Sequence, residues 1–323
     1  MALPPGYRWR PVRDEDAESV AAFANEECEA LIDARVYSAT GLLQSWTAPS
    51  IDRERDVAVV EGPAGELCAY LGVGADPPYT EVSVLGIVAL PCHGRGIGAA
   101  LVAEGERRAR RVLELVDANR RVVLHADTLV GVPQVSSLMT ACGYREVRRF
   151  WLMRIDFDGE PAAPRAVPGI EVRTLRPDVD ARPVFEADRE AFADHWGAGQ
   201  PTYEDFRHYV MAGPMFDPAL CHVAWSGDEV AGYMTAIEES EEGASRGYAQ
   251  VLGVRRAYRR QGIGEGLVRH TFRALYARGK AGCDLHVDAE SETGATRIYE
   301  RVGMTAHPRF ATWEKELRPA GDG

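Results

Sequence analysis

The chain repeats part of its own sequence, and this repeat limits its possible folds more than any other feature. Leu124-His125-Ala126-Asp127 aligns with Leu285-His286-Val287-Asp288 at an offset of 161 residues (286 − 125), and Gly96-Ile97-Gly98 aligns with Gly262-Ile263-Gly264 at 166 (262 − 96). The order is preserved, and the offset drifts only by loop-sized insertions. At 323 residues the chain exceeds one typical domain of roughly 100 to 200 residues, so the repeat predicts two copies of one domain.

Each half begins with a short alternating strand, at residues 7–12 and 170–175. Prolines in residues 159–168 forbid a continuing helix and favour an extended linker. We therefore predict an N-terminal domain over 1–158, a linker over 159–168 and a C-terminal domain over 169–318. In both halves a strand, helices, strands, a glycine-rich turn, a helix, a strand, a helix and a strand follow in that order, which indicates an α/β fold.

Composition narrows the classes of protein that this chain can be. With 46% hydrophobic and 27% charged residues it is globular rather than disordered, and a net charge of −12 argues against nucleic acid as a partner. The six cysteines form no C-x-x-C pair, which suits a reducing compartment and gives no metal-ligand spacing. No stretch is long and apolar enough to span a membrane, so we expect a cytoplasmic protein without membrane contact.

A glycine-rich turn in the second half has the composition of an anion site. The strand 249–254 runs into Arg255, Arg256, Arg259 and Arg260, then Gly262-Ile263-Gly264, and a helix follows over roughly 265–278. Glycines allow a ligand to approach the backbone, and the N–H groups that begin a helix favour phosphate oxygens. The G-K-[ST] ending of a P-loop and the G-x-G-x-x-G spacing are both missing. An ordinary tight turn is the alternative interpretation.

Two segments carry a resemblance to a known family. Arg259-Arg260-Gln261-Gly262-Ile263-Gly264, which reads R-x-x-G-x-G, resembles the acetyl-CoA signature of the GNAT acetyltransferases. Residues 288–304 are similar to the last strand and helix of that family. The resemblance implies two tandem GNAT-like domains of the α/β (α+β) class, each a mixed, mostly antiparallel sheet flanked by helices. It also implies acetyl-CoA as co-substrate, with no metal.

The resemblance also implies which residues hold the coenzyme. In the family, the backbone of the turn binds the pyrophosphate, and the preceding strand holds the pantetheine arm and the thioester carbonyl. Ser291 stands where the family commonly has Asn against the cofactor arm. The expected acetyl-CoA-binding residues are Leu252, Gly253, Val254, Arg259, Arg260, Gln261, Gly262, Ile263, Gly264 and Ser291.

Acetyl transfer to an amine needs an acid for the departing thiolate and a base for the amine. Tyr299 occupies the position where the family often protonates the coenzyme A sulfur, and packing between helix and sheet is its alternative role. The base stays open, because the strand before the turn offers Tyr248 and Gln250 where the family often has Glu. Glu238 and Glu239 are candidate carboxylates or solvated loop acids.

Two histidines are weaker candidates. His286 has a repeat partner, His125, in the half expected to be inactive, so a shared structural role is favoured. Asp194-His195-Trp196-Gly197 lies where GNAT folds usually bind the acceptor. Without a candidate Ser or Cys nucleophile, this segment is interpreted as a loop or as a wall of the acceptor pocket, with Trp196 as a lining residue.

The first half reads as a degenerate copy. His93 stands where the signature expects Arg or Gln, so weaker anion affinity is expected there. Counting back from Gly143 as from Gly303, the position of Tyr299 is taken by Met139, which cannot donate a proton. Glu81 lies where a family base would sit. We expect transfer only in the second half.

The leading functional hypothesis is an acetyl-CoA-dependent N-acetyltransferase that acetylates a primary amine, expected to be a small molecule, by direct transfer. The tandem layout is similar to that of the mycothiol synthases of actinobacteria, so mycothiol synthesis is one candidate assignment. A non-catalytic acyl-CoA-binding or sensing protein and a protein N-acetyltransferase are the alternatives. Expected partners are the coenzyme A thioester and the amine acceptor, with the chain as a monomer or homodimer.

Overall fold

The computed structural model describes residues 2–193, 195–197, 199–240, 243–291 and 294–321. The chain forms two compact units. The first comprises Met1–Arg149, Gly199–Thr202 and Arg309–Gly323, and the second comprises Phe150–Ala198 and Tyr203–Pro308. Each unit therefore contains a piece of the other half of the sequence, which distinguishes these units from the predicted domains 1–158 and 169–318.

Within the described residues, the first unit is built on six strands in the order β1-β2-β3-β4-β5-β12, where β12 is Thr305–Arg318 and only β4 and β5 are parallel neighbours. Its elements, in chain order, are β1 (Arg8–Pro11), α1 (Asp16–Ile32), α2 (Ala39–Trp46), α3 (Arg53–Asp56), β2 (Val57–Glu61), β3 (Leu67–Gly74), β4 (Glu81–Val88), α4 (Ile97–Ala109), β5 (Val122–Leu129), α5 (Pro133–Ala141) and the start of β6 (Arg145–Asp156). Short 3-10 helices cover Leu90–Cys92 and Arg110–Glu114.

The second unit repeats this plan with the order β6-β11-β10-β9-β8-β7, of which only β10 and β11 are parallel. Its elements are β7 (Glu171–Thr174), α6 (Pro177–Phe192), α7 (Tyr203–Phe206), β8 (His222–Ser226), β9 (Glu229–Ile237), β10 (Arg246–Val254), α8 (Ile263–Ala277), β11 (Gly282–Asp288), α9 (Ala295–Arg301) and β12 (Thr305–Arg318). A π-helical turn, Arg207–Met211, and 3-10 turns at Pro218–Leu220 and Arg256–Tyr258 complete it. Residues 159–168 carry neither helix nor strand.

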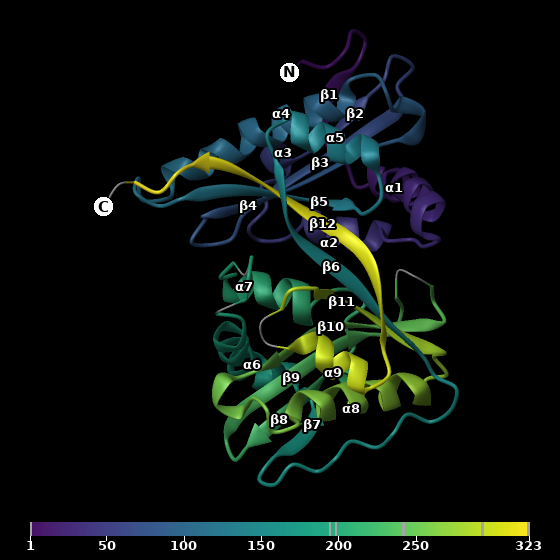
Figure 1. The fold of residues 1–323 in the computed structure, drawn as a ribbon, viewed down its shortest axis with the longest axis vertical. Coiled ribbons are helices and arrows are strands. Elements are labelled where there is room, and N and C mark those ends of the chain that lie inside the picture. Colours follow the sequence, from purple (N-terminus) through teal and green to yellow (C-terminus); the bar gives the residue numbers. More distant parts are fainter. Residues whose placement is uncertain (1, 194, 198, 241–242, 292–293, 322–323) are drawn as a thin grey trace. The chain divides into compact units, whose positions relative to one another are not determined.

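The two halves of the sequence exchange their last strands. Residues 150–156 of β6 pair antiparallel with β11, from Phe150↔Asp288 to Asp156↔Gly282, inside the second unit. In the first unit, residues 310–318 of β12 pair with β5. Figure 1 shows teal β6 beside β11 and yellow β12 beside β5. Each unit obtains its sixth strand from the other half, and this exchange moves its boundaries away from the linker.

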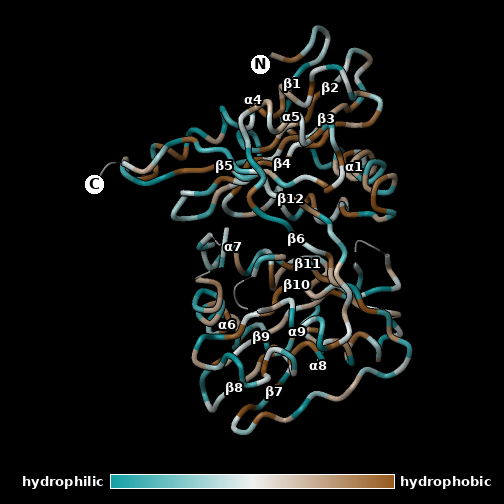
Figure 2. Tube along the Cα trace, in the orientation of Figure 1, coloured by the Kyte–Doolittle hydropathy of each residue, from teal (hydrophilic) through white to brown (hydrophobic). Residues whose placement is uncertain are grey.

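Each sheet has a hydrophobic core on both of its faces, and the side chains of each strand alternate between the two cores. In the second unit Cys283, Leu285 and Val287 of β11 pack with α8 and α9, whereas Val251 of β10 packs in the core beneath α6 and α7. Hydrophobic stretches follow strands such as β10 and β11 in Figure 2. Within the described residues, no helix is long and apolar enough to cross a bilayer.

Candidate active site

The parallel strands β10 and β11 separate after three paired residues. They pair only at Arg246↔Gly282, Gly247↔Cys283 and Tyr248↔Asp284, although both strands continue. Just beyond, the register of β10 against β9 shifts between Ala249 and Val251, so Gln250 forms a bulge. A cavity of about 690 Å³ opens here, lined by residues 249–254 of β10 and 285–288 of β11.

The turn between β10 and α8 forms one wall of this cavity. Arg260 (φ 63°) and Gly262 (φ 90°) both take the left-handed conformation, and Gly262 caps α8. The first N–H groups of a helix have no acceptor within it, and the helix dipole places positive charge there. A Cβ on Gly264 would lie 3.2 Å from Ile298 Cδ1, so the turn packs closely against α9. The geometry suits a bound pyrophosphate.

The structure gathers the predicted site residues around this one cavity. Gln261 is the exception among them, since its exposed side chain donates to the carbonyl of Ala257 at 3.1 Å. The predicted residues that line the cavity are Leu252, Gly253, Val254, Arg259, Arg260, Gly262, Ile263, Gly264, Ser291 and Tyr299. Their part in binding and catalysis stays a prediction.

Arg255 and Arg259 of the turn bond groups within the protein. Arg259 donates from Nε to the carbonyl of Val254 at 3.1 Å and from Nη2 to the carbonyl of Ala191 at 2.8 Å. The guanidinium of Arg255 bonds Glu190 at 2.6 Å. Arg259 therefore shapes the turn, and the positive charge directed at a ligand is smaller than a count of arginines suggests. Arg260 is exposed and lines the cavity.

Tyr299 lies on α9 and is only 7% exposed. Burial raises the pKa of its hydroxyl well above the usual value of about 10, and the nearby Cys283 thiol adds to the rise. The phenol therefore stays protonated at neutral pH, as a proton donor must. Ser291 also borders the cavity, in a turn where its N–H donates to the carbonyl of Asp288 at 3.2 Å.

Neither candidate carboxylate lines the cavity. Glu238 pairs with Arg278 at 3.0 Å and with Lys280 at 3.3 Å, and Glu239 is exposed. His286, which sequence reasoning set aside, does line it, with its Nδ1 3.0 Å from the hydroxyl oxygen of Tyr248. The register of β10 against β11 explains this contact. Tyr248 pairs with Asp284, and His286, two residues further along β11, lies on the same strand face as Asp284.

The segment predicted as an acceptor wall contributes one side chain to the cavity. His195 lines it, with Nδ1 2.9 Å from the carbonyl of Trp196 and its ring 5.6 Å from that of Phe192. Trp196 is not among the described residues that line the cavity. Asp194 lies outside the described residues.

The first unit keeps the backbone of the turn without the same chemistry. Gly94 (φ 72°) and Gly96 (φ 83°) repeat the left-handed pair of the second unit. Ser83, which aligns with Gln250, pairs regularly with Gly74, so β4 has no bulge at that position. Met139 is buried at the position of Tyr299.

Glu81 in the first unit faces a histidine. Its carboxylate lies 3.6 Å from His125 Nδ1, and Glu314 approaches Nε2 of the same ring at 3.3 Å.

Across the described part of the chain, no group of three or more His, Cys, Asp or Glu side chains could hold a metal ion.

Comparisons with known proteins bear on the chemistry. Residues 182–304 match the Acetyltransferase (GNAT) family. The mycothiol acetyltransferase of Thermobispora bispora is 30% identical over 293 residues, which cover 90% of this chain and 92% of that protein. The mycothiol acetyltransferase of Catenulispora acidiphila is 31% identical over 223 residues, 68% of each chain.

Solved structures show the same architecture. A GCN5-related N-acetyltransferase from Sphaerobacter thermophilus superposes with a TM-score of 0.78 at 32% identity, covering 100% of this chain and 99% of that one. A tandem GNAT protein from the clavulanic acid biosynthesis pathway, 17% identical, has a TM-score of 0.68 over 98% of this chain and 99% of its own, a likeness of fold alone. The predicted fold class, two tandem mixed sheets flanked by helices, is confirmed.

Proposed function

The chain belongs to the GNAT family of acetyltransferases, and on that premise we propose that its second unit transfers an acetyl group from acetyl-CoA to the primary amine of a small molecule. That the chain is an N-acetyltransferase agrees with the sequence prediction and sets aside the non-catalytic alternative.

The observation that carries the proposal is the cavity between β10 and β11. It joins three parts that acetyl transfer needs: a helix N-terminus for phosphates, strand edges without sheet partners for an extended arm, and a protonated phenol. β4 of the first unit lacks the bulge, and Met139 replaces the phenol. These differences favour the second unit.

The geometry suggests which residues bind acetyl-CoA and which one donates a proton during transfer. The N–H groups at the turn from Arg260 to Gly264 bind the pyrophosphate, and the backbone of Leu252, Gly253 and Val254 pairs with the pantetheine arm as a strand would. The amine attacks the thioester carbon, the carbon–sulfur bond breaks, and Tyr299 gives its proton to sulfur. A positioned acid of this kind contributes roughly 10² to 10⁴ in rate.

The acceptor proposal rests on the relatives. Two relatives that match this chain at 30 to 31% identity are named mycothiol acetyltransferases, so mycothiol lacking its acetyl group is the first candidate acceptor. A panel with this amine, glucosamine, putrescine and a ten-residue peptide with a free N-terminus tests the choice by mass spectrometry of the acetylated product. Acetylation of the peptide alone would replace the small-molecule acceptor by a protein N-terminus.

Two matched glycine variants test which unit binds acetyl-CoA. A Cβ would lie 3.2 Å from Ile298 at Gly264 and 3.1 Å from Leu138 at Gly98, so Gly264→Glu and Gly98→Glu place the same crowding and charge in equivalent turns. We expect Gly264→Glu to abolish turnover and weaken acetyl-CoA binding at least 100-fold by calorimetry, while Gly98→Glu keeps turnover. The reverse result would move the active site to the first unit. Circular dichroism verifies that both variants fold.

A further inference from the structure

We propose that His286, positioned by Tyr248, is the group that accepts the proton of the acceptor amine. The inference rests on the proposed function of the second unit and supplies the base that its strand lacks. The Tyr248 hydroxyl and His286 Nδ1 lie 3.0 Å apart, and the two ring centres are separated by 5.8 Å. With Nδ1–H donating to the hydroxyl oxygen of Tyr248, the proton is exchanged at Nε2.

The strands place His286 across the cavity from the proposed acid. Cys283, Leu285 and Val287 of β11 pack toward α8 and α9, the face on which Tyr299 lies. His286 alternates with them and therefore points to the other face of the sheet. Both His286 and Tyr299 line the cavity. One side chain can thus serve the nitrogen and the other the sulfur of the same reaction.

The internal repeat shows that this pair replaces a carboxylate. Glu81 pairs with Val123 in the first unit, and Tyr248 pairs with Asp284 in the second, so Glu81 and Tyr248 occupy the same ladder position. Both face the repeated histidine of the neighbouring strand. In the first unit two carboxylates contact that histidine, Glu81 at 3.6 Å and Glu314 at 3.3 Å. In the second unit a phenol takes the place of the strand carboxylate.

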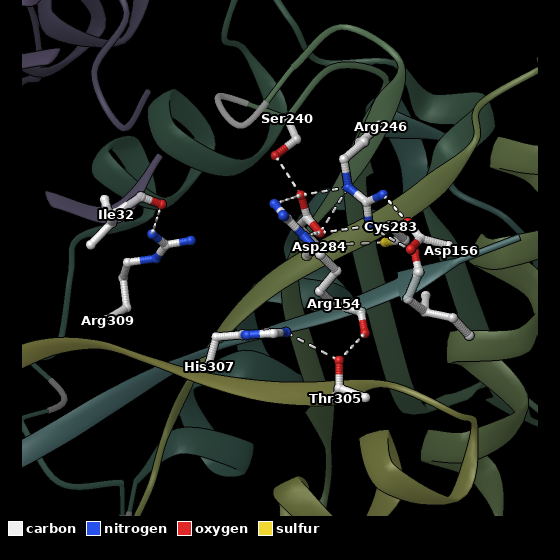
Figure 3. A network of polar contacts seen from close by, with 11 residues as sticks. Ile32, Arg154, Asp156, Ser240, Arg246, Cys283, Asp284, Thr305, His307 and Arg309 are labelled. Carbon is white, nitrogen blue, oxygen red and sulfur yellow. Dashed lines mark hydrogen bonds and ion pairs between the residues drawn. The ribbon is translucent and has the colours of Figure 1, made fainter. Parts of the chain in front are cut away.

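The charged groups nearest to His286 on its own strand are committed to other bonds. Asp284 accepts hydrogen bonds from Arg246 (2.9 Å), Arg154 (3.0 Å) and Ser240 (3.2 Å), and Figure 3 shows its carboxylate between the two guanidinium groups. Asp288 accepts from the N–H of Glu290 at 2.9 Å.

Strand β6 and the loop after α6 each contribute a charged or titratable group near the cavity that His286 lines. Arg154 is the cation that β6 contributes next to this face, and its charge is matched by that of Asp284. His195, from the loop after α6, is a further titratable group that lines the same cavity, as are Glu265 and Tyr258. A histidine side chain is suited to accept a proton near neutral pH.

Two protons leave the acceptor nitrogen during the proposed reaction. The acceptor arrives as an ammonium ion and loses one proton to His286. The amine nitrogen then bonds the thioester carbon, the carbon–sulfur bond breaks, and Tyr299 protonates the departing thiolate. The second nitrogen proton passes through water to restore the Tyr299 phenol, and His286 releases its proton to solvent. One amide, one thiol and one proton result.

Kinetics of four variants test the assignment, with acetyl-CoA and the amine that the wild type acetylates fastest. We expect His286→Gln to lower kcat at least 100-fold and to remove the acid limb of the kcat profile, with acetyl-CoA affinity unchanged. Tyr248→Phe, which removes a positioning hydroxyl, lowers kcat about 10-fold and shifts that limb. Tyr248→Glu in the His286→Gln background restores part of the rate by returning a carboxylate to the strand. His125→Gln, the matched change in the first unit, leaves kcat unaltered.

The outcomes separate this inference from the proposed function. If the wild type turns over and His286→Gln keeps its rate and acid limb, His286 is not the base, although the second unit can still be the active one. If Gly264→Glu keeps full activity, the proposed function fails first.

A measurement without acceptor provides a second test. Nitrogen-15 NMR of the histidine rings in the coenzyme A complex, assigned with His286→Gln, follows the protonation of His286 from pH 5 to 9. We expect His286 to titrate in this range and its midpoint to move in Tyr248→Phe. A ring that keeps one charge throughout would overturn the assignment.

Discussion

His93 and Arg259 support equivalent turns by bonding the same carbonyl of the strand before each turn. His93 Nε2 donates to the carbonyl of Val88 at 2.9 Å, and Arg259 Nε donates to that of Val254 at 3.1 Å. The histidine that suggests a weakened anion site in the sequence therefore preserves the backbone of the turn. The two units differ instead at two other places. β10 has a bulge before the turn and β4 has none, and Met139 takes the position of Tyr299 in the first unit.

Arg259→Ala tests whether Arg259 acts on the turn or on the ligand. It removes two bonds from a cation to backbone carbonyls, and we expect it to lower the free energy of unfolding by about 1 to 3 kcal/mol and to weaken acetyl-CoA binding. Arg259→His should recover part of both losses, since His93 shows that an imidazole reaches this carbonyl. Denaturant unfolding and calorimetry measure the two quantities. Weaker binding without loss of stability would mean that the guanidinium contacts the phosphates directly.

Tyr299→Phe tests the acid. It keeps the ring that packs in the core and removes the hydroxyl, so we expect kcat to fall by roughly 10² to 10⁴ while acetyl-CoA affinity changes little. Because burial raises the pKa of this phenol well above its usual value, the wild type should show no loss of kcat from Tyr299 up to at least about pH 10. An alkaline limb near pH 9 that disappears in Tyr299→Phe would contradict this.

Local patterns made the fold and the turn predictable. The alternation of apolar residues, the glycine spacing and the repeat each depend on neighbours in sequence, and the structure follows them. The helix after the turn begins at Ile263, two residues before the predicted start at 265. Its buried side chains, such as Leu267 and Leu275, recur at helical spacing toward one core.

Pairing between distant strands was not predictable in the same way. β6 and β12 each end one repeat with a similar pattern, and nothing in their periodicity says which sheet each joins. The importance of His286 depends on the register of β10 against β11, which the sequence does not specify. The bond from Arg259 to Ala191 likewise joins residues 68 positions apart.

Asp284→Asn tests the ion-pair cluster that joins three strands. In it, Asp284 of β11 bonds Arg246 of β10 and Arg154 of β6. Burial alone would raise the pKa of Asp284, but the bonds from Arg246 and Arg154 outweigh it and lower the pKa below its usual value. The carboxylate therefore contributes stability above roughly pH 4, and this contribution is lost as the pH falls through the lowered value. We expect Asp284→Asn to cost about 3 to 5 kcal/mol in urea unfolding at pH 7.

The control for this change is Asp156→Asn. Asp156 bonds the same Arg246, but its side chain is 72% exposed, so its loss should cost less than about 1 kcal/mol. Equal costs for the two variants would show that burial of Asp284 does not govern the strength of the cluster.

His222 gives the second unit a distinct acid sensitivity. Burial, with a smaller effect of neighbouring His270 at 5.5 Å, lowers the pKa of His222 to about 4. The unfolded chain, with a histidine pKa near 6.5, then binds more protons than the folded protein between about pH 4 and 6.5. Stability should fall across that window by roughly 1.4 kcal/mol per pH unit as the pH is lowered. His222→Leu should flatten the slope, and His307→Leu, at an exposed histidine, should not. An unchanged slope in His222→Leu, measured by urea unfolding from pH 4 to 7, would assign the sensitivity to another group.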